Sequence, residues 1–584
     1  MGTSLWLADR RPATLAHAGA EGPRGASSRR AGPPPDASGP WPAWLWRGTL
    51  VLILVGVAWR SLRYLLQFPI WGDEAFVALN LLDRNYLGLT RPLRYVQVAP
   101  VLFLWVELTA YRLLGGSELA LRLFPFLAGL GALALFWRFV RSSLSPLAGG
   151  LALGILAVSY YPVRHSCEIK PYALDLLASL ALLVTAANWL REPNRRAWPL
   201  LLTVLGPLAV ASSYPSIFIA GSIGLVLLPA VARQPGWKPW ALYAAYNVTT
   251  AAAFLAAYSV VGSRQYASAG GTGNPFWDAW FPPAEPVALL KWLAAAHTGN
   301  LFAYPVGGRG GGSVATFLLC TVGVWHLART RQGRLLALCA LPFGFTLSAA
   351  ALRLYPYGGS ARVAQHLAPA ICALAGIGAA ALIARLAPSL LSQRRAVLVA
   401  FGGLALIGIG GMGRDVIKPS KTESDARVRE IAAQIFAQAG PDDQIVVLNP
   451  TPASMPPALE WYLRQGRHRI SWGGGIDRER LDTTTKHLWV FAFPGNTITR
   501  DDLEARLAAA KRRPLLADHA TYAFHFGWPE GEVHRCEIFH WVYEPDHGAR
   551  PPADLAHAVA STGGILVPKA FAERWQGRHP SWFA

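Results

Sequence analysis

Two adjacent carboxylates follow the first long apolar stretch of the chain, residues 47–66. The segment reads Trp71-Gly72-Asp73-Glu74. If the apolar stretch spans a membrane, acidic side chains beside it are costly unless they are solvated, paired or functional. A solvated loop start is the simplest interpretation of the pair alone, and a general base that accepts a proton is the alternative. Because two carboxylates can also bind a divalent cation, the sequence leaves metal dependence open.

A second cluster of ionisable side chains occupies residues 163–175, where two apolar stretches meet. Arg164, Lys170 and Tyr172 are residue types that anchor helices at a membrane interface, which is the structural explanation. Anchoring does not explain Glu168 and the histidine three residues before it. We therefore interpret this turn as a place where cations can bind an anion beside a carboxylate.

A third cluster begins at Arg353 and ends at Arg362, just before another apolar stretch. Guanidinium groups can simply extend from a helix end into the headgroup layer. Two arginines near one another also suit phosphate oxygens, which they bind through two parallel hydrogen bonds. The pattern favours a site for an anionic headgroup.

The composition indicates the class of protein that must position these clusters. Of 584 residues, 53% are hydrophobic and only 15% are charged, whereas soluble domains carry about 25% charged residues. The net charge of +20 is concentrated in short Arg-rich segments between apolar stretches. That distribution is typical of the cytoplasmic loops of an integral membrane protein. It lacks the basic face interleaved with aromatics that nucleic-acid binding requires, so we expect no nucleic-acid partner.

Eleven apolar stretches are long enough, or nearly so, to cross the roughly 30 Å hydrocarbon core. They are residues 47–66, 119–138, 146–162, 172–190, 198–213, 215–232, 240–261, 313–328, 335–351, 364–384 and 396–412. A further stretch, residues 98–114, carries Glu107 and Arg112. If it also crossed, every later Arg cluster would lie outside, against the positive-inside rule. We therefore predict that residues 98–114 form an interfacial helix, with the N-terminus inside and the three clusters on the external face.

Composition also divides the chain into three parts. Residues 1–45 are rich in Ala, Gly, Pro, Ser and Arg and are expected to form a disordered cytoplasmic tail. Residues 46–412 form the predicted all-α transmembrane catalytic domain. Residues 413–584 have a soluble composition and are predicted to form an external, periplasmic α/β domain. Its expected helices are residues 424–439, 457–465 and 501–511, and its expected strands are residues 444–448, 488–493 and 538–543.

The order of the polar motifs resembles that of the GT-C superfamily of polytopic membrane glycosyltransferases. Within it, the chain more closely resembles the bacterial branch related to protein O-mannosyltransferases and to the aminoarabinose transferases that act on lipid A. The motifs that carry the resemblance are Trp71-Gly72-Asp73-Glu74, Gln97-Val98-Ala99-Pro100, Gly116-Ser117-Glu118 with Leu121-Arg122-Leu123-Phe124-Pro125, Glu168-Ile169-Lys170-Pro171-Tyr172, and Tyr355-Pro356-Tyr357-Gly358-Gly359 with Arg362 and Pro369.

The resemblance implies an inner-membrane enzyme that takes a sugar from a polyprenyl-phosphate carrier. By position, Asp73 matches the catalytic base of the family, with Glu74 as its companion. Lys170 and Tyr172 match the segment near the carrier phosphate, although the branch more usually has Arg where this chain has Lys170. No second diagnostic carboxylate stands out, so three residues compete for a supporting role: Glu107, Glu118 and Glu168.

We therefore predict transfer of a hexosyl or pentosyl group from a polyprenyl-phosphate donor to an unknown glycan, lipid or protein acceptor on the external face. The residues agree with this prediction, because glycosyl transfer needs a base and a lipid phosphate leaving group needs cations. The predicted catalytic residues are Asp73, Glu74 and Glu168, and the predicted phosphate ligands are Arg164, Lys170, Tyr172, Arg353 and Arg362. The expected partners are this donor, its acceptor and membrane lipids, with no cofactor required other than, in one alternative, a divalent metal ion.

Two other functional classes remain open at this point. A flippase or transporter of lipid-linked precursors should carry charged residues along a path through the spans. A non-catalytic scaffold of the cell envelope should tolerate replacement of Asp73. Nothing in the sequence indicates whether Cys167 and Cys536 pair.

Overall fold

The structure is a computed structural model that describes residues 41–438, apart from 269, 271–274 and 309–310. Beyond residue 438 it describes separate stretches, mainly 444–448, 457–465, 469–472, 487–492, 515–525 and 533–542. The predicted tail lies outside the described residues except for its last five positions, and α1 already begins at Ala43.

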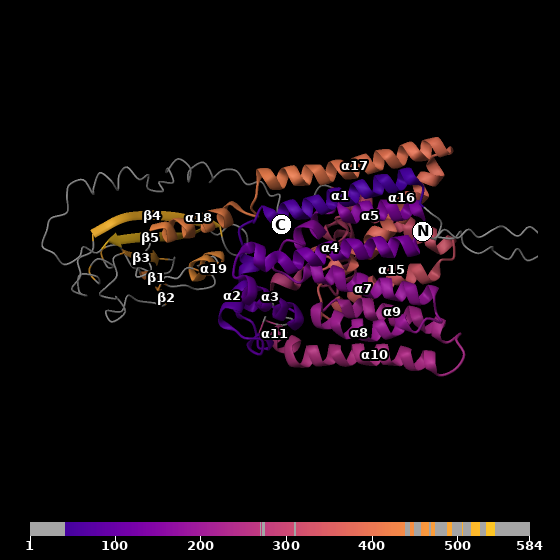
Figure 1. Cartoon of the computed structure of the whole chain (residues 1–584), viewed down its shortest axis with the longest axis horizontal. Helices are drawn as coiled ribbons and strands as arrows, with labels where there is room; N and C mark the ends of the chain where they lie inside the picture. Colours follow the sequence, from indigo (N-terminus) through magenta and orange to yellow (C-terminus); the bar gives the residue numbers. More distant parts are fainter. Residues whose placement is uncertain are drawn as a thin grey trace, which may run out of the picture.

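Long apolar helices packed side by side make up most of the described chain (Figure 1). Each of the eleven predicted stretches coincides with one of them: α1 (Ala43–Leu65), α4 (Glu118–Ser143), α5 (Pro146–Ala157), α7 (Tyr172–Arg191), α8 (Ala197–Ser212), α9 (Ser216–Val231), α10 (Lys238–Ala257), α14 (Gly312–Arg329), α15 (Gly333–Ala351), α16 (Ala368–Leu386) and α17 (Leu390–Ile417). Seven helices among the described residues are long and apolar enough to cross a membrane. The chain is thus a multi-pass membrane protein, while eleven crossings remain a prediction.

Small residues allow these helices to approach one another closely. A Cβ on Gly378 of α16 would lie 1.9 Å from the carbonyl oxygen of Leu319 in α14. A Cβ on Gly56 of α1 would lie 2.4 Å from the carbonyl oxygen of Ala157 in α5. Close backbone packing of this kind stabilises helix pairs inside a bilayer, where burial of apolar surface gives no advantage over lipid.

Shorter elements connect the long helices. Near the first cluster they are α2 (Gly72–Asp83), the 3₁₀ turns η1 (Gly88–Thr90) and η2 (Arg94–Val96), α3 (Val101–Leu114) and α6 (Tyr160–His165). Later in the chain they are the π-turn η3 (Tyr258–Gly262), α11 (Ser263–Ser268), α12 (Pro275–Asp278), α13 (Pro286–Thr298), η5 (Asn300–Phe302) and η6 (Gln365–Leu367). In Figure 1, α2 and α3 lie at the end of the helical bundle that is nearer to the sheet.

The dimensions of α3 agree with an interfacial position for residues 98–114. It has 14 residues, which at 1.5 Å per residue gives about 21 Å, less than the hydrocarbon core. Leu113 and Leu114 at its end are exposed in the structure, as expected of side chains that enter a lipid layer.

Thiol labelling tests this topology. In a background without native cysteines, we expect Leu114→Cys in intact cells to react with an impermeant thiol reagent, since the positive-inside rule places the end of α3 outside. Ser145→Cys, in the exposed turn between α4 and α5, should react only after permeabilisation. Labelling of Leu114→Cys solely from the inside would contradict the eleven-span topology.

The C-terminal part contains the predicted alternation of helices and strands. The elements are α18 (Glu423–Gln438), β1 (Gln444–Leu448), α19 (Pro457–Gln465), β2 (Arg469–Trp472), β3 (His487–Ala492), β4 (Leu515–His525) and β5 (Val533–Val542). The sheet order is β2-β1-β3-β5-β4, with β1 parallel to β2 and β3, and β5 antiparallel to β3 and β4. Strands β2 and β4 were not predicted, and the expected helix 501–511 lies mostly outside the described residues.

The last long apolar helix ends later in the chain than the predicted stretch does. Helix α17 continues to Ile417 instead of ending at 412. The reason is that Asp415, which looks like the start of a polar segment, is buried against α1. Its carboxylate binds Arg63 Nη1 at 2.7 Å and Trp59 Nε1 at 2.8 Å. A paired charge of this kind is tolerated at the end of a membrane helix.

Helix α19 packs onto α2, and both C-terminal helices share its hydrophobic core. Trp461 and Leu459 of α19 belong to the same buried cluster as Leu79 of α2. The Tyr462 hydroxyl donates to Glu118 Oε1 at 2.8 Å and accepts from the backbone N–H of Ile70 at 2.8 Å. The segment before α2 and the start of α4 are therefore held against the C-terminal part, and an independent soluble domain remains a prediction.

Candidate active site

Asp73 lies in the first turn of α2, between two cations that come from distant parts of the chain. Lys170 Nζ is 2.9 Å from Asp73 Oδ1, and Arg362 Nη1 is 3.3 Å from Asp73 Oδ2. The Asp73 side chain is 20% exposed, so it is accessible from the end of the bundle. A carboxylate held between two cations can accept a proton and lies where an anion would bind.

The same cations control the charge of Asp73. Burial raises the pKa of this carboxyl, but the charges of Lys170 and Arg362 outweigh burial, and the net shift is below its ordinary value. Asp73 is therefore ionised at neutral pH. It becomes a stronger base when either cation is drawn to another anion.

Glu74, the neighbouring carboxylate, has different partners. It is fully buried, and its two oxygens bind Arg122 Nε at 2.9 Å and Arg122 Nη2 at 2.5 Å. Oε1 also accepts the backbone N–H of Ile169 at 2.8 Å. Glu74 thus holds the turn that carries Lys170. The two adjacent acids differ because neighbouring residues on a helix point about 100° apart.

Glu168 is also buried, and both of its oxygens are occupied. Arg164 Nε lies 2.6 Å from Oε1, and His165 Nδ1 lies 2.7 Å from Oε2. Burial raises the pKa of Glu168, but Arg164 and His165 lower it well below its ordinary value. Burial lowers the pKa of His165, so this ring is neutral near pH 7. The arrangement positions Arg164, whose guanidinium lies 5.6 Å from the centroid of the Trp71 ring.

The two arginines of the third cluster separate in the structure. Arg362 reaches Asp73 and lies over the rings of Trp277 and Trp280, 5.9 and 5.5 Å from their centroids. Arg353 pairs instead with Asp278. The structure therefore does not bring Arg353 to the Asp73 cluster. A physical reason is the left-handed backbone of Arg353, with φ of 56°, in the turn that ends α15.

The remaining predicted residues lie in different surroundings. Tyr172, at the start of α7, contacts the His165 ring edge to face, with centroids 4.9 Å apart. Glu118 binds Tyr462 of the C-terminal part. Glu107 is fully buried in α3, and neither of its oxygens has a hydrogen-bond partner among the described residues. Cys167 is a buried free thiol.

The two adjacent carboxylates, Asp73 and Glu74, do not share partners in the structure. Asp73 and Glu74 are engaged by different cations, so their oxygens do not converge on one point. Within the described part of the chain, no group of three or more His, Cys, Asp or Glu side chains is arranged to hold a metal ion.

Two residues near Asp73 were missed by sequence reasoning as members of the site. Gln97 Oε1 accepts a hydrogen bond of 2.7 Å from Lys170 Nζ, and its place in a recognised motif was the available signal. Lys421 lies over the ring of Trp71. As a single lysine in a polar segment, it carried no signal.

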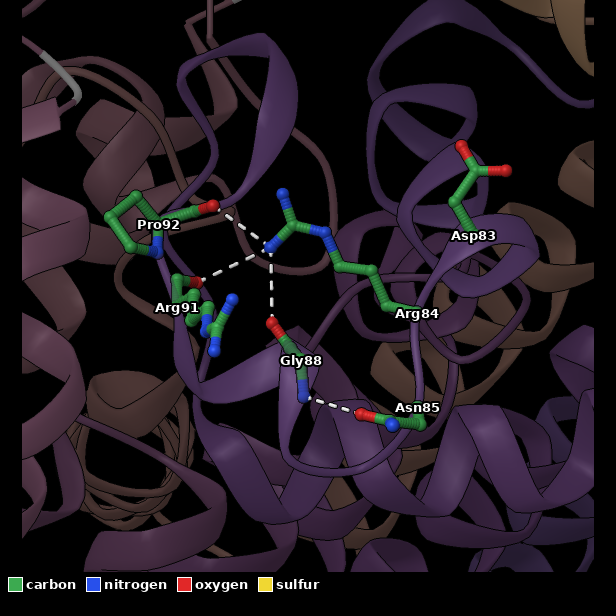
Figure 2. A pocket seen from close by; sticks show the side chains of 6 residues that line it. All are labelled: Asp83, Arg84, Asn85, Gly88, Arg91 and Pro92. Carbon is green, nitrogen blue, oxygen red and sulfur yellow. Dashed lines mark hydrogen bonds between the residues drawn. The ribbon is translucent and has the colours of Figure 1, made fainter.

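An open pocket of about 410 Å³ lies apart from these residues, in the loop that follows α2 (Figure 2). Its lining is Asp83, Arg84, Asn85, Gly88, Arg91 and Pro92. Arg84 Nη1 donates to the carbonyl oxygens of Gly88 at 3.2 Å and Pro92 at 2.8 Å. Because Arg84 is used to close the loop, we interpret the pocket as part of the loop structure and not as the reaction site.

Comparisons with known proteins address the resemblance independently. Residues 98–263 match the family model described as dolichyl-phosphate-mannose-protein mannosyltransferase. No curated protein matches the sequence.

Similar solved structures include ArnT from Cupriavidus metallidurans bound to undecaprenyl phosphate. It is 15% identical, with a TM-score of 0.49 over 85% of this chain and 98% of that chain. They also include the archaeal oligosaccharyltransferase AglB from Archaeoglobus fulgidus in complex with an inhibitory peptide and a dolichol-phosphate. It is 12% identical, with a TM-score of 0.43 over 77% of this chain and 69% of that chain. The family match confirms what the motifs indicate: over residues 98–263 the chain is similar to the membrane glycosyltransferases of the GT-C superfamily related to protein O-mannosyltransferases.

Proposed function

We propose that the protein transfers a hexosyl or pentosyl group from a polyprenyl-phosphate donor to an acceptor at the external face of the cell membrane. The observation that carries the proposal is the position of Asp73, a partly exposed carboxylate between Lys170 and Arg362. The resemblance to glycosyltransferases over residues 98–263 supports the reaction class.

In this proposal each group of the cluster has one task. Asp73 accepts the proton of the acceptor hydroxyl while that oxygen forms a bond to the anomeric carbon of the sugar. The bond between the anomeric carbon and the phosphate oxygen breaks, and its electron pair leaves with the polyprenyl phosphate. Lys170, Arg362 and Arg164 stabilise the charge that develops on the phosphate.

The ion pairs also couple donor binding to proton transfer. A phosphate that draws Lys170 and Arg362 away from Asp73 removes the two charges that lower the pKa of this carboxyl. Asp73 then becomes a stronger base only when a donor is present. Glu74 and Glu168 act as positioning residues, since their oxygens are occupied by Arg122, Arg164 and His165.

The two alternative functions, a transporter and a non-catalytic scaffold, lead to different expectations for the Asp73 cluster. A transporter of lipid-linked precursors needs polar groups along a path through the spans, whereas Asp73, Lys170 and Arg362 gather at one end of the helices. A non-catalytic scaffold would be insensitive to loss of these cations. We therefore favour the transferase.

Replacement of the cations tests the proposal. We expect Arg362→Ala and Lys170→Ala each to lower kcat/KM for a polyprenyl-phosphate sugar about thirtyfold, because an unpaired phosphate oxygen at a partly desolvated site costs about 2 kcal/mol. The measurement is donor-dependent transfer in proteoliposomes with a panel of labelled polyprenyl-phosphate sugars.

Two further variants make this experiment specific. Arg91→Ala, an exposed arginine in the loop after α2, should leave transfer unchanged. Arg353→Ala should have a smaller effect than Arg362→Ala, because Arg353 pairs with Asp278. Normal kinetics in both Arg362→Ala and Lys170→Ala would remove these residues from the site.

A further inference from the structure

Lys421 lies beside the Asp73 cluster although it belongs to the segment that leads into the C-terminal part. Its Nζ lies over the face of the Trp71 ring, 2.7 Å from the centroid. Arg164 lies over the same ring, with 5.6 Å between its guanidinium carbon and the centroid. Because Trp71 directly precedes the turn that holds Asp73, two cations share one aromatic ring at the edge of the cluster.

The fold holds this segment at both ends. On one side, Asp415 near the end of α17 binds Arg63 and Trp59 of α1. On the other side, hydrogen bonds between Thr422 and Asp425 cap the start of α18, and Arg429 of that helix donates to the carbonyl oxygen of Gln67, just after α1, at 2.5 Å. The position of Lys421 therefore follows from the packing of the two parts.

The charges of the cluster leave room for an anion. Among the described residues beside Trp71, Asp73 and Lys421, the cations are Arg164, Lys170, Arg362 and Lys421, and the carboxylates are Asp73, Glu168 and Asp425. Four cations against three carboxylates leave an excess of one positive charge near neutral pH. A phosphate monoester carries at least one negative charge near neutral pH, so its binding would offset this excess.

The present partner of Lys421 is one that a phosphate can replace. A cation on an aromatic face is held less strongly than one in a charge-assisted hydrogen bond to phosphate. The four side-chain carbons of Lys421 let the ammonium change partner without movement of the backbone. The Trp71 ring therefore holds the Lys421 ammonium beside the cluster until an anion binds.

We propose that Lys421 is a further ligand of the carrier phosphate, so that the segment joining the membrane part to the C-terminal part completes the donor site. The inference rests on the proposed function. In the absence of donor the ammonium lies on Trp71, and in its presence the ammonium donates to an oxygen of the polyprenyl phosphate.

The surroundings of Lys421 give the proposal a pH signature. Burial is the largest cause that lowers its pKa, followed by the charge of Arg164, while Glu168, Asp73 and Asp425 oppose them, and the result is a pKa of about 7. Binding a phosphate favours the ammonium form, so binding takes up a proton above this pKa. Affinity for phosphate is therefore highest below pH 7 and falls as the pH rises from 7 to 9.

None of the other groups that face Lys421 gives the same signature. Arg164 remains charged throughout this range. The pKa of Asp73 and of Glu168 lies below the ordinary carboxyl value, and burial raises that of Asp425 only to about 6. The second ionisation of a phosphate monoester is also near 6. A change between pH 7 and 9 thus reports Lys421.

The test is binding of a short-chain polyprenyl phosphate to the full-length protein in nanodiscs at pH 7, 8 and 9. We expect wild-type affinity to fall several-fold across this range. Lys421→Ala should bind about tenfold more weakly at pH 7 and show no pH dependence. Lys421→Arg should keep wild-type affinity at pH 7 and hold it to pH 9, because guanidinium does not titrate in this range.

The controls separate this inference from the proposed function and from a structural role. Lys418→Ala, an exposed lysine three positions earlier, should behave as wild type. If wild-type protein transfers sugar but Lys421→Ala and Lys421→Arg keep the wild-type affinity and pH profile, Lys421 is not a phosphate ligand and the transferase stands. Should Lys421→Ala fail to fold, a pH profile in Lys421→Arg that still falls from 7 to 9 would overturn the inference.

Discussion

Asp73→Asn should fold, bind donor and lose glycosyl transfer by a factor of about 10² or more, the usual contribution of a general base. Asparagine keeps the shape of the side chain but cannot accept the proton. Because the substitution also removes the negative charge between Lys170 and Arg362, donor affinity should be equal or higher. The measurements are kcat and donor KM in proteoliposomes, with thermal unfolding recorded alongside.

A matched carboxylate makes this result specific to Asp73. Asp278→Asn removes an acid that pairs with Arg353 away from the cluster, and we expect near-normal transfer.

The pKa of Asp73 is below its ordinary value, so the acid limb of kcat/KM should lie below the usual carboxyl range in wild type. Near-normal transfer by a stable Asp73→Asn protein would exclude Asp73 as the base. Glu107, which has no hydrogen-bond partner among the described residues, would become the next candidate.

The second large effect concerns stability. Glu74→Gln leaves the Arg122 guanidinium buried without its counter-charge, since both side chains are at most 3% exposed. Removal of one partner of a buried ion pair destabilises a protein by about 3–5 kcal/mol. We expect a clear fall in Tm in detergent. Glycosyl transfer should fall as the unfolded fraction of the protein rises. It should fall further because the turn that carries Lys170 is no longer held in place.

An exposed ion pair is the control for this prediction. Arg195 and Glu192 are 3.3 Å apart with side chains 62% and 52% exposed, and Arg195→Ala should change stability by no more than about 1 kcal/mol. A Glu74→Gln protein with unchanged Tm and strongly reduced kcat would instead mean that Glu74 takes part in the reaction, as the sequence alone allowed.

Much of the architecture could be predicted because its signals are local. Length and apolar content of each stretch determine whether a helix can cross a bilayer, and all eleven predicted stretches coincide with helices. Turn residues and alternation likewise indicated the helix Pro457–Gln465 and the strand Gln444–Leu448. Strand β4 was missed although its partner β5 is the next strand along the chain, because its polar and apolar residues do not alternate regularly and its register shifts between Leu516 and Asp518.

The sequence by itself determined that this is a membrane protein with three ionisable clusters, because composition and motif order need no knowledge of contacts. Only the tertiary structure decided which charges meet. Asp73 and Glu74 are adjacent, yet their directions on α2 give them different cations. Arg353 and Arg362 share a loop, yet only Arg362 reaches Asp73, 289 positions away. The sequence could not place Lys421 in the cluster for the same reason. Electrostatic interactions depend on distance and burial, and packing sets both.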